Sequence, residues 1–414
     1  MLNRREILLK LGIGALLSAC GGGGGSSGTP AIGNSQANTG SPAPAGGTSG
    51  TSQGGTGSSS GGSSTAGGSQ GGTRGSGGGS GTTGGSQGGG GSSGPLSIKF
   101  GLGDDPERMI NGYDPNGEMV LRRLNPQIVC FWLNGGRDSS GRITGSSMSF
   151  IRNWANARRF EEWSRAGYEI MLITWENYDG QNPGLGARTN GDYHTSEDFI
   201  RDLREILQIL RDQVNTKTYI VLATEQSTYT ACRQDSSCPH RIPHTDVISD
   251  QTRNYFSALR ANLLRAIDEI RRILPNSDFG TCFGGWLVEF PEGIEFIRFF
   301  EPVINASNAV FFQSMMDFKA SERGGYGNPQ RILRNCEFYS SYRKPIHLAH
   351  YMPNNHRADV VADDARQMTN AEYLRRLHSL GLRSFSFMYY GTVKDNRFNS
   401  LDELSRLRNL MRSF

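Results

Sequence analysis

Residues 97–414 alternate short apolar runs with longer segments whose apolar residues recur at helical spacing. Strands that alternate with helices in this way indicate an α/β fold with a parallel sheet. Roughly 250 residues are enough to close a (β/α)8 barrel, or TIM barrel, so the segment also has room for long loops. The sequence therefore predicts such a barrel with strands at 97–103, 127–133, 169–174, 218–224, 278–284, 309–315, 345–349 and 383–388.

The first twenty residues have the features of a targeting segment rather than of a folded domain. Their apolar run, 7–17, is shorter than the roughly 20 residues that span a bilayer. The sequence Leu-Ser-Ala-Cys, which ends at Cys20, resembles the lipobox of bacterial lipoproteins, in which the cysteine is acylated. Arg4-Arg5 resembles a twin-arginine export signal, and an ordinary positive start is the alternative. Glycine rather than aspartate follows Cys20, which favours an outer-membrane anchor.

Residues 21–95 consist almost wholly of Gly, Ser, Thr, Gln and Ala, with Arg74 as their only charge. Such a segment has too little apolar surface to offset the entropy lost on folding, so we expect a disordered linker. A Gly-rich coil of this length has ends on the order of 50 Å apart. The sequence thus predicts three parts: a lipoprotein signal peptide at 1–20, a linker at 21–95 and a barrel domain at 96–414.

Most of the formal net charge of +4 lies outside the barrel. The signal peptide carries +2 and the linker +1, which leaves the barrel near +1. A nearly neutral domain gives no indication of binding to nucleic acid or to an acidic membrane surface. We therefore expect no nucleic-acid partner, and membrane attachment only through the lipid on Cys20.

The six cysteines fall into distinct settings. Cys130 and Cys282 lie within predicted strands, where a cysteine is a small core residue. Cys232 and Cys238 lie in the long loop after the fourth strand, and we expect a local disulfide between them in an oxidising compartment. A metal site is the alternative, but this spacing lacks the CxxC pairs of zinc sites. Cys336 has no obvious partner.

Polar and aromatic residues gather at the carboxyl ends of the predicted strands, where barrel enzymes carry their chemistry. Carboxylates, amides and flat rings together are typical of sugar sites, because pyranose faces stack on Trp and Tyr while hydroxyls pair with polar groups. Packing at the barrel rim is the alternative for Trp132 and Trp286. The predicted sugar-contact residues are Trp132, Asn134, Trp175, Tyr178, Gln226, Trp286, Gln313, Asp317, His350, Tyr351 and Tyr390.

Glu176 and Glu225 are the strongest catalytic candidates, because each directly follows an apolar strand and the two strands are neighbours. Adjacent strands lie about 4.8 Å apart, so like-charge repulsion can raise the pKa of one carboxyl. Period-two alternation can instead direct one of them away from the barrel axis. Asp104, Asp105 and Asp317 also follow strands, where a helix cap is the alternative to a functional role.

The third predicted strand carries a resemblance to a known family. Residues 171–178, Met-Leu-Ile-Thr-Trp-Glu-Asn-Tyr, are similar to the strand that ends in Thr-Trp-Glu-Pro in the β-mannanases of glycoside hydrolase family 26. A helix and a strand with a terminal glutamate follow, and Lys-Pro-Ile at 344–346 opens the seventh strand. The chain resembles the retaining glycoside hydrolase clan over most of 97–395 as architecture, and only over short stretches as sequence. The resemblance implies that Glu225 is the acid/base residue.

Two positions depart from that family's pattern. The family has His before the acid/base residue and Met-Asn after it, whereas this chain has Thr224, Gln226 and Ser227. On the seventh strand the family places its nucleophilic glutamate where this chain has His350. Without a carboxylate there, double displacement through a glycosyl enzyme cannot run in the usual way.

Three interpretations stay open at this point. The barrel hydrolyses by inversion, with Glu225 as acid and Glu176, Asp317 or an aspartate of the first strand activating water. Alternatively it binds sugar without cleaving it, or the seventh strand is aligned wrongly. The sequence thus predicts an exported, lipid-anchored glycoside hydrolase-like protein acting on an envelope or extracellular polysaccharide. The alternative is a non-catalytic carbohydrate-binding or adhesion lipoprotein.

Other chemistries find less support in the sequence. His347 and His350 are three apart on a predicted strand, so we expect their side chains on opposite faces. His240, His244 and His356 are scattered in loops. The barrel segment has neither a Gly-x-Ser-x-Gly elbow nor a Gly-rich phosphate loop. We therefore expect no metal and no cofactor.

Overall fold

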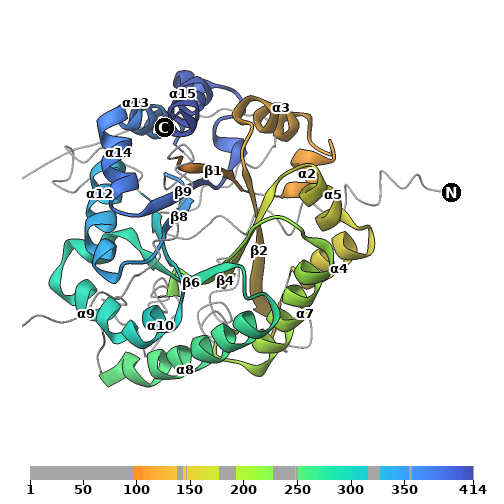
Figure 1. Ribbon diagram of the computed structural model, residues 1–414, viewed down its shortest axis with the longest axis vertical. Coiled ribbons are helices and arrows are strands. Elements are labelled where there is room, and N and C mark those ends of the chain that lie inside the picture. The colour runs from red at the N-terminus through yellow and green to blue at the C-terminus, as the bar shows by residue number, and fades with distance from the viewer. Residues whose placement is uncertain are drawn as a thin grey trace, which may run out of the picture. The chain divides into compact units, whose positions relative to one another are not determined.

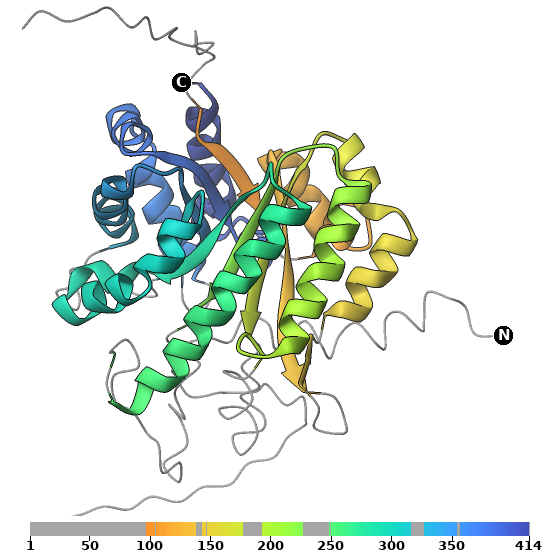
Figure 2. The same cartoon turned by 60° about the horizontal axis from the view of Figure 1, so that its bottom comes forward.

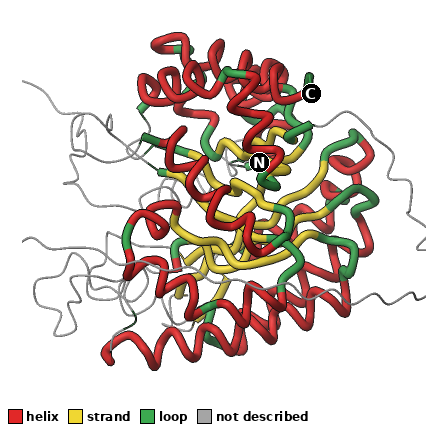
Figure 3. Tube along the Cα trace, turned by 60° about the vertical axis from the view of Figure 1, so that its left-hand side comes forward, coloured by secondary structure: helices red, strands yellow, loops and turns green. Residues whose placement is uncertain are grey.

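Eight parallel strands close into a barrel, and helices form a ring around it (Figures 1 and 3). The strand order is β1-β9-β8-β7-β6-β5-β4-β2, and pairing of β1 with β2 closes the circle. The predicted (β/α)8 barrel is thereby confirmed. The computed structural model describes residues 97–103, 105–137, 143–145, 147–176, 193–226, 248, 250–315, 327–353 and 357–413.

The barrel strands match the apolar runs of the sequence closely, and the fourth and fifth have the predicted bounds. The second and third extend farther toward their carboxyl ends, and a short antiparallel strand, β3 (Ile143–Gly145), pairs with the extension of β2. The barrel strands are β1 (Lys99–Leu102), β2 (Ile128–Arg137), β4 (Glu169–Glu176), β5 (Thr218–Thr224), β6 (Asp278–Gly284), β7 (Val310–Ser314), β8 (Ile346–Tyr351) and β9 (Leu382–Phe387).

Local signals in the sequence fix the helix ends. Asp114 caps α3 through a hydrogen bond from the Asn116 amide, and Pro115 occupies the first turn. Ser196 caps α7 by accepting from the Phe199 amide. The α-helices are α2 (Pro106–Ile110), α3 (Pro115–Leu124), α4 (Met148–Asn156), α5 (Arg159–Arg165), α7 (Glu197–Gln213), α8 (Asp250–Ile273), α9 (Pro291–Phe299), α10 (Glu301–Ala306), α12 (Asn328–Tyr339), α13 (Ala358–Met368), α14 (Ala371–Ser379) and α15 (Ser400–Arg412).

Four short 3₁₀ segments complete the described elements: η2 (Gly285–Glu289), η3 (Ser340–Tyr342), η5 (Tyr390–Thr392) and η6 (Arg397–Asn399). Within the described ranges, no helix is both long enough and apolar enough to cross a bilayer. The predicted signal peptide, including Cys20, and the predicted linker lie outside the described residues.

Alternation along the strands divides the core into two parts. One set of side chains fills the barrel interior and includes Cys130, Val221 and Cys282. The residues between them, such as Phe131 and Leu222, face outward and pack under the helices. Figure 2 shows the strands running between these helices. Cys130 and Cys282 are fully buried free thiols, which confirms their prediction as core residues.

A polar layer closes the interior at the amino ends of the strands. Lys99 Nζ lies 2.6 Å from Glu169 Oε1, and the Tyr219 hydroxyl donates to Glu169 Oε2 over 2.6 Å. Burial and the neighbouring carboxylate raise the pKa of Tyr219. Beside them, His347 Nε2 lies 3.2 Å from Asp278 Oδ2. We call these five residues the barrel floor.

His194 is buried just before α7, and burial lowers its pKa from the ordinary 6.5 to about 3. Its Nε2 lies 3.0 Å from Thr174 Oγ1, and its carbonyl accepts from Asn262 Nδ2 over 2.7 Å. Below pH 6.5 the unfolded chain protonates this imidazole while the folded chain keeps it neutral. The unfolded state then binds more protons, so stability falls as the pH is lowered from 6.5 toward 3.

In the wild type, this imidazole lowers the free energy of unfolding by up to about 1.4 kcal/mol for each pH unit below 6.5. We predict that His194→Gln removes this contribution, so that the unfolding free energy depends less on pH. Urea unfolding of both proteins between pH 3.5 and 7.5 measures the difference. Parallel curves of unfolding free energy against pH would contradict the assignment.

Candidate functional site

One glutamate at the carboxyl ends of the strands is bonded to the first ring of an aromatic chain, Trp175–Trp132–His350. The Trp175 indole donates its N–H to Glu225 Oε2 over 3.1 Å. The Trp132 ring packs edge-on against Trp175, with centroids 6.2 Å apart, and against His350 at 5.4 Å. Glu225 is only 5% exposed, whereas Trp132 is half-buried. We call these four residues, which come from β2, β4, β8 and the end of β5, the rim cluster.

The backbone that carries Glu225 is strained. Ala223 and Glu225 both have left-handed φ angles, 50° and 61°, which are uncommon for residues other than glycine. The register between β4 and β5 shifts at this point. The Ala223 amide donates to Thr174 Oγ1 over 2.8 Å, and His194 contacts the same hydroxyl. Left-handed residues held in place by their surroundings are frequent at functional sites.

Three buried amide side chains lie beside the rim cluster. Gln226 donates from Nε2 to Thr281 Oγ1 and to the Cys282 carbonyl, both over 3.3 Å. Gln313 on β7 is fully buried, and neither of its amide atoms has a hydrogen-bond partner within the described structure. An unpaired buried amide costs roughly 1–3 kcal/mol, so such groups are typical of sites that hold water or a ligand. Asn134, also buried, is the register partner of Trp175.

This arrangement can bind a sugar and move a proton. The partly exposed ring of Trp132 provides a flat apolar surface of the kind on which pyranose rings stack, whereas Trp175, 4% exposed, holds Glu225. The amides of Gln226 and Gln313 pair with hydroxyls, and a buried carboxyl such as that of Glu225 is suited to general acid catalysis. The structure thus brings together seven of the predicted site residues: Trp132, Asn134, Trp175, Glu225, Gln226, Gln313 and His350.

The prediction that His347 and His350 face opposite sides of their strand is wrong. His347 stacks on Phe311 in the barrel interior, and His350 contacts the Trp132 ring at the rim. The pairing of β8 with β9 shifts between Leu348 and Tyr351. A β-bulge adds a residue and re-aims the following side chains, so strict alternation does not hold there.

Three predicted sugar-contact residues lie away from the rim cluster. The Tyr351 side chain points outward and donates to Asp364 on α13, and Tyr390 donates to Asp114 at the start of α3. Both pack in the outer core, as does the half-buried Trp286. Tyr389, the neighbour of Tyr390, packs against the interior instead. Alternation after the last strand thus selects Tyr389 rather than Tyr390 for the inner face.

Several predicted residues cannot be placed in the site. Asp105 is described and caps α2 by accepting from the Glu107 and Arg108 amides, which confirms the alternative reading of this aspartate as a helix cap. Burial raises its pKa to about 6. Glu176 ends β4, but its side chain lies outside the described part of the chain. The remaining predicted residues outside the described ranges are Asp104, Tyr178, Cys232, Cys238 and Asp317.

Sequence reasoning did not identify the support beneath Glu225. Thr174 was recognised only as a strand residue, and His194 lies in a loop without a motif. A polar residue at the end of an apolar strand was the available signal for Thr174, whereas its contact with His194 arises only from the fold.

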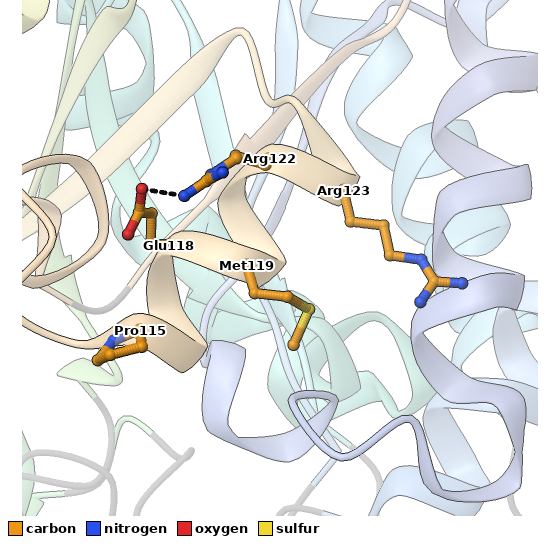
Figure 4. A pocket seen from close by; sticks show the side chains of 5 residues that line it. All are labelled: Pro115, Glu118, Met119, Arg122 and Arg123. Atoms are coloured by element: carbon orange, nitrogen blue, oxygen red, sulfur yellow. Dashed lines mark hydrogen bonds and ion pairs between the residues drawn. The ribbon is translucent and has the colours of Figure 1, made fainter.

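Away from the strand ends, one surface hollow and the metal-ligating residue types complete the picture. The described residues include no group of three His, Cys, Asp or Glu side chains placed to hold a metal ion. A surface hollow on α3 is lined by one proline, one methionine and charged side chains (Figure 4). Arg122 pairs with Glu118 there, and Arg123 pairs with Asp402 of α15. This hollow lies in the helix layer and brings no reactive group to the strand ends.

Comparisons with known proteins give structural neighbours without sequence relatives. No protein-family model matches the chain, and no curated protein matches it by sequence. Similar solved structures include an exo-β-1,4-mannosidase from Opitutaceae bacterium strain TAV5, with 12% identity and a TM-score of 0.41. The alignment covers 70% of this chain and 52% of the mannosidase, so the chain spans about half its length.

Two further neighbours are covered more fully. A β-glucosidase from Thermotoga maritima has 11% identity and a TM-score of 0.44, over 71% of this chain and 88% of the glucosidase. An endo-1,4-β-mannanase from Rhizomucor miehei has 11% identity and a TM-score of 0.42, over 70% of this chain and 85% of the mannanase. At such identities the likeness concerns the barrel alone, and the functional argument rests on the rim cluster.

We predict that Trp175→Phe lowers the free energy of unfolding by about 1–3 kcal/mol at neutral pH, because it leaves the buried Glu225 carboxyl without the indole donor. The matched control is Trp154→Phe, which removes the same kind of bond, 2.8 Å long, to the more exposed Glu107. We expect a loss below about 1 kcal/mol for the control. Equal losses of unfolding free energy in the two variants, measured by urea unfolding, would show that the burial of Glu225 does not strengthen its bond to the indole.

Proposed function

We propose that this chain is a glycoside hydrolase-like protein that acts on the glycosidic bonds of an envelope or extracellular polysaccharide. The observation that carries the proposal is the placement of Glu225: a buried carboxyl at the end of β5, bonded to the Trp175 indole, whose ring packs against Trp132. Carboxyl ends of barrel strands are the site of chemistry in enzymes of this fold.

In the proposed mechanism Glu225 is the general acid that protonates the leaving glycosidic oxygen. Trp132 and His350 form one wall of the sugar site, and Gln226 and Gln313 pair with hydroxyls. A second carboxylate activates water or attacks the anomeric carbon. Glu176, the last residue of β4, and Asp317, which follows β7, are the proposed candidates for that role.

The proposed location is the outer membrane, reached through export and acylation of Cys20. Support for this comes from the lipobox-like sequence before Cys20 and from the Gly- and Ser-rich segment that separates it from the barrel. A linker of this composition lets a tethered domain reach polymer some distance from its anchor.

A second candidate function is sugar binding without cleavage. The observation that favours it is that β8 ends in His350 and Tyr351 without a carboxylate, since the resemblance aligns His350 with the family's nucleophilic glutamate. An imidazole there can pack against a sugar and donate a hydrogen bond but cannot form a glycosyl ester.

We predict that Glu225→Gln lowers glycan hydrolysis by roughly 10² to 10⁴-fold, because the amide cannot supply a proton to the leaving oxygen. Reducing-end release from mannans, glucans, xylans and bacterial exopolysaccharides measures this effect. Glu403→Gln is the matched control, since Glu403 on α15 is 7% exposed and lies outside the rim cluster. Full activity of Glu225→Gln would contradict the role given to Glu225. Glycan binding without any release by the wild type would favour the second candidate.

We predict that Trp132→Ala weakens glycan affinity about 3- to 10-fold, because it removes a stacking surface from the rim cluster. Trp286→Ala is the matched control, since Trp286 packs against the outer core, and we expect its dissociation constant to remain unchanged. Calorimetric titration of both variants with the best-bound glycan tests the contrast. A larger effect at Trp286 would place the sugar elsewhere.

A further inference from the structure

A buried chain of hydrogen bonds lies behind the strands that carry Gln313 and His350. Ser314 Oγ donates to Asn328 Oδ1 over 2.7 Å, and Asn328 Nδ2 donates to Asp364 Oδ2 over 2.6 Å. The Tyr351 hydroxyl donates to the same Asp364 oxygen over 2.8 Å. None of these four side chains is more than 5% exposed. The chain joins the ends of β7 and β8 to α12 and α13, and we call it the strand clamp.

The clamp acts on neighbours of the candidate site. Ser314 and Tyr351 are register partners across β7 and β8, and they directly follow Gln313 and His350, which are also register partners. Phe311 lies in the interior and Phe312 in the outer core, so alternation directs Gln313 inward and Ser314 outward. The outward pair is therefore held by the clamp while the inward pair faces the rim.

The strands need such support because their ladder is irregular at this level. The β7–β8 register shifts between Phe312 and Gln313, and the β8–β9 register shifts between Leu348 and Tyr351. A bulge leaves a residue unpaired and increases the local twist, so the backbone ladder alone fixes side-chain direction less firmly. Hydrogen bonds from the outward side chains to two helices restrict that freedom.

The surroundings of Asp364 indicate that its carboxyl stabilises the fold through its hydrogen bonds to Asn328 and Tyr351. Burial raises its pKa to about 6, against the bonds from Asn328 and Tyr351, and Asp363 raises it further while Arg331 lowers it. Arg331 is itself held by Glu289 through two bonds, 2.5 and 3.0 Å long. Burial of a carboxyl is itself unfavourable, so any stability that Asp364 adds comes from its hydrogen bonds.

We propose that Asp364 and Asn328 are positioning residues: by clamping Ser314 and Tyr351 from outside the barrel, they set the direction of Gln313 and His350 at the rim. The proposal rests on the function proposed above only in assigning those two residues to the sugar site. Its structural content, that the clamp sets the orientation of the His350 ring, can be tested without substrate.

The test uses the full-length protein with Asp364→Ala, Asp364→Asn and Tyr351→Phe. Tyr373→Phe is the matched control, because it removes a nearby, partly buried hydroxyl whose bond, over 2.6 Å to the Pro329 carbonyl, is not part of the clamp. The first readout is the set of imidazole ¹⁵N and ¹³C shifts of His350, assigned with His350→Gln. The second is kcat and KM on the glycan that the wild type cleaves best.

We expect Asp364→Ala and Tyr351→Phe to shift the His350 signals and to lower kcat/KM at least tenfold. Asp364→Asn, whose amide oxygen can still accept both bonds, should remain within about threefold of wild type, and Tyr373→Phe should change only the melting temperature. If Asp364→Ala fails to fold, Tyr351→Phe carries the test.

Two results would overturn the proposal. One is that Tyr351→Phe, like Tyr373→Phe, lowers the melting temperature but leaves the His350 shifts and kcat/KM unchanged. The other is an Asp364→Asn variant as impaired as Asp364→Ala. A wild type that cleaves no glycan would count against the proposed function alone, since the His350 shifts still report on the clamp.

Discussion

Closure of the strand ladder is the constraint on which the rest of the structure depends. Because β1 pairs with both β2 and β9, the eight strands have no open edge, and their inner side chains must fill a space of fixed width. The middle of that space holds apolar side chains such as Val221 and Phe311. Polar chemistry is thereby confined to the two ends of the barrel, and the carboxyl end carries the rim cluster.

The departures from regular strand geometry coincide with the candidate site. Left-handed residues flank Thr224 on β5, and the ladders of β7 and β8 shift beside Gln313 and His350. A β-bulge re-aims the side chains that follow it, and on β8 it brings His350 to the inner face, from which strict alternation after His347 would have turned it away. The strained positions are stabilised from behind by Thr174, His194 and the strand clamp.

The sequence was sufficient to predict the architecture, because each buried parallel strand is a short apolar run and a segment with helical spacing separates it from the next. All eight strand positions follow from that signal. It also predicted Glu225, Trp132 and Trp175, since each ends or nearly ends a run. The faces of Tyr351 and Tyr390 were mistaken because side-chain direction at a strand end depends on the bulges and on the strand's last paired residue. Neither feature has a local signature in the sequence, and the partner of Tyr390, Asp114, lies 276 residues away in the chain.

The barrel floor has a consequence for the shape of any substrate. The contacts of Glu169 with Lys99 and Tyr219, and of Asp278 with His347, block the amino end of the interior, so the barrel has no passage from one end to the other. A polymer of the kind proposed above therefore cannot be threaded through the molecule and released on the far side. It would approach and leave at the carboxyl ends of the strands, where Glu225 lies.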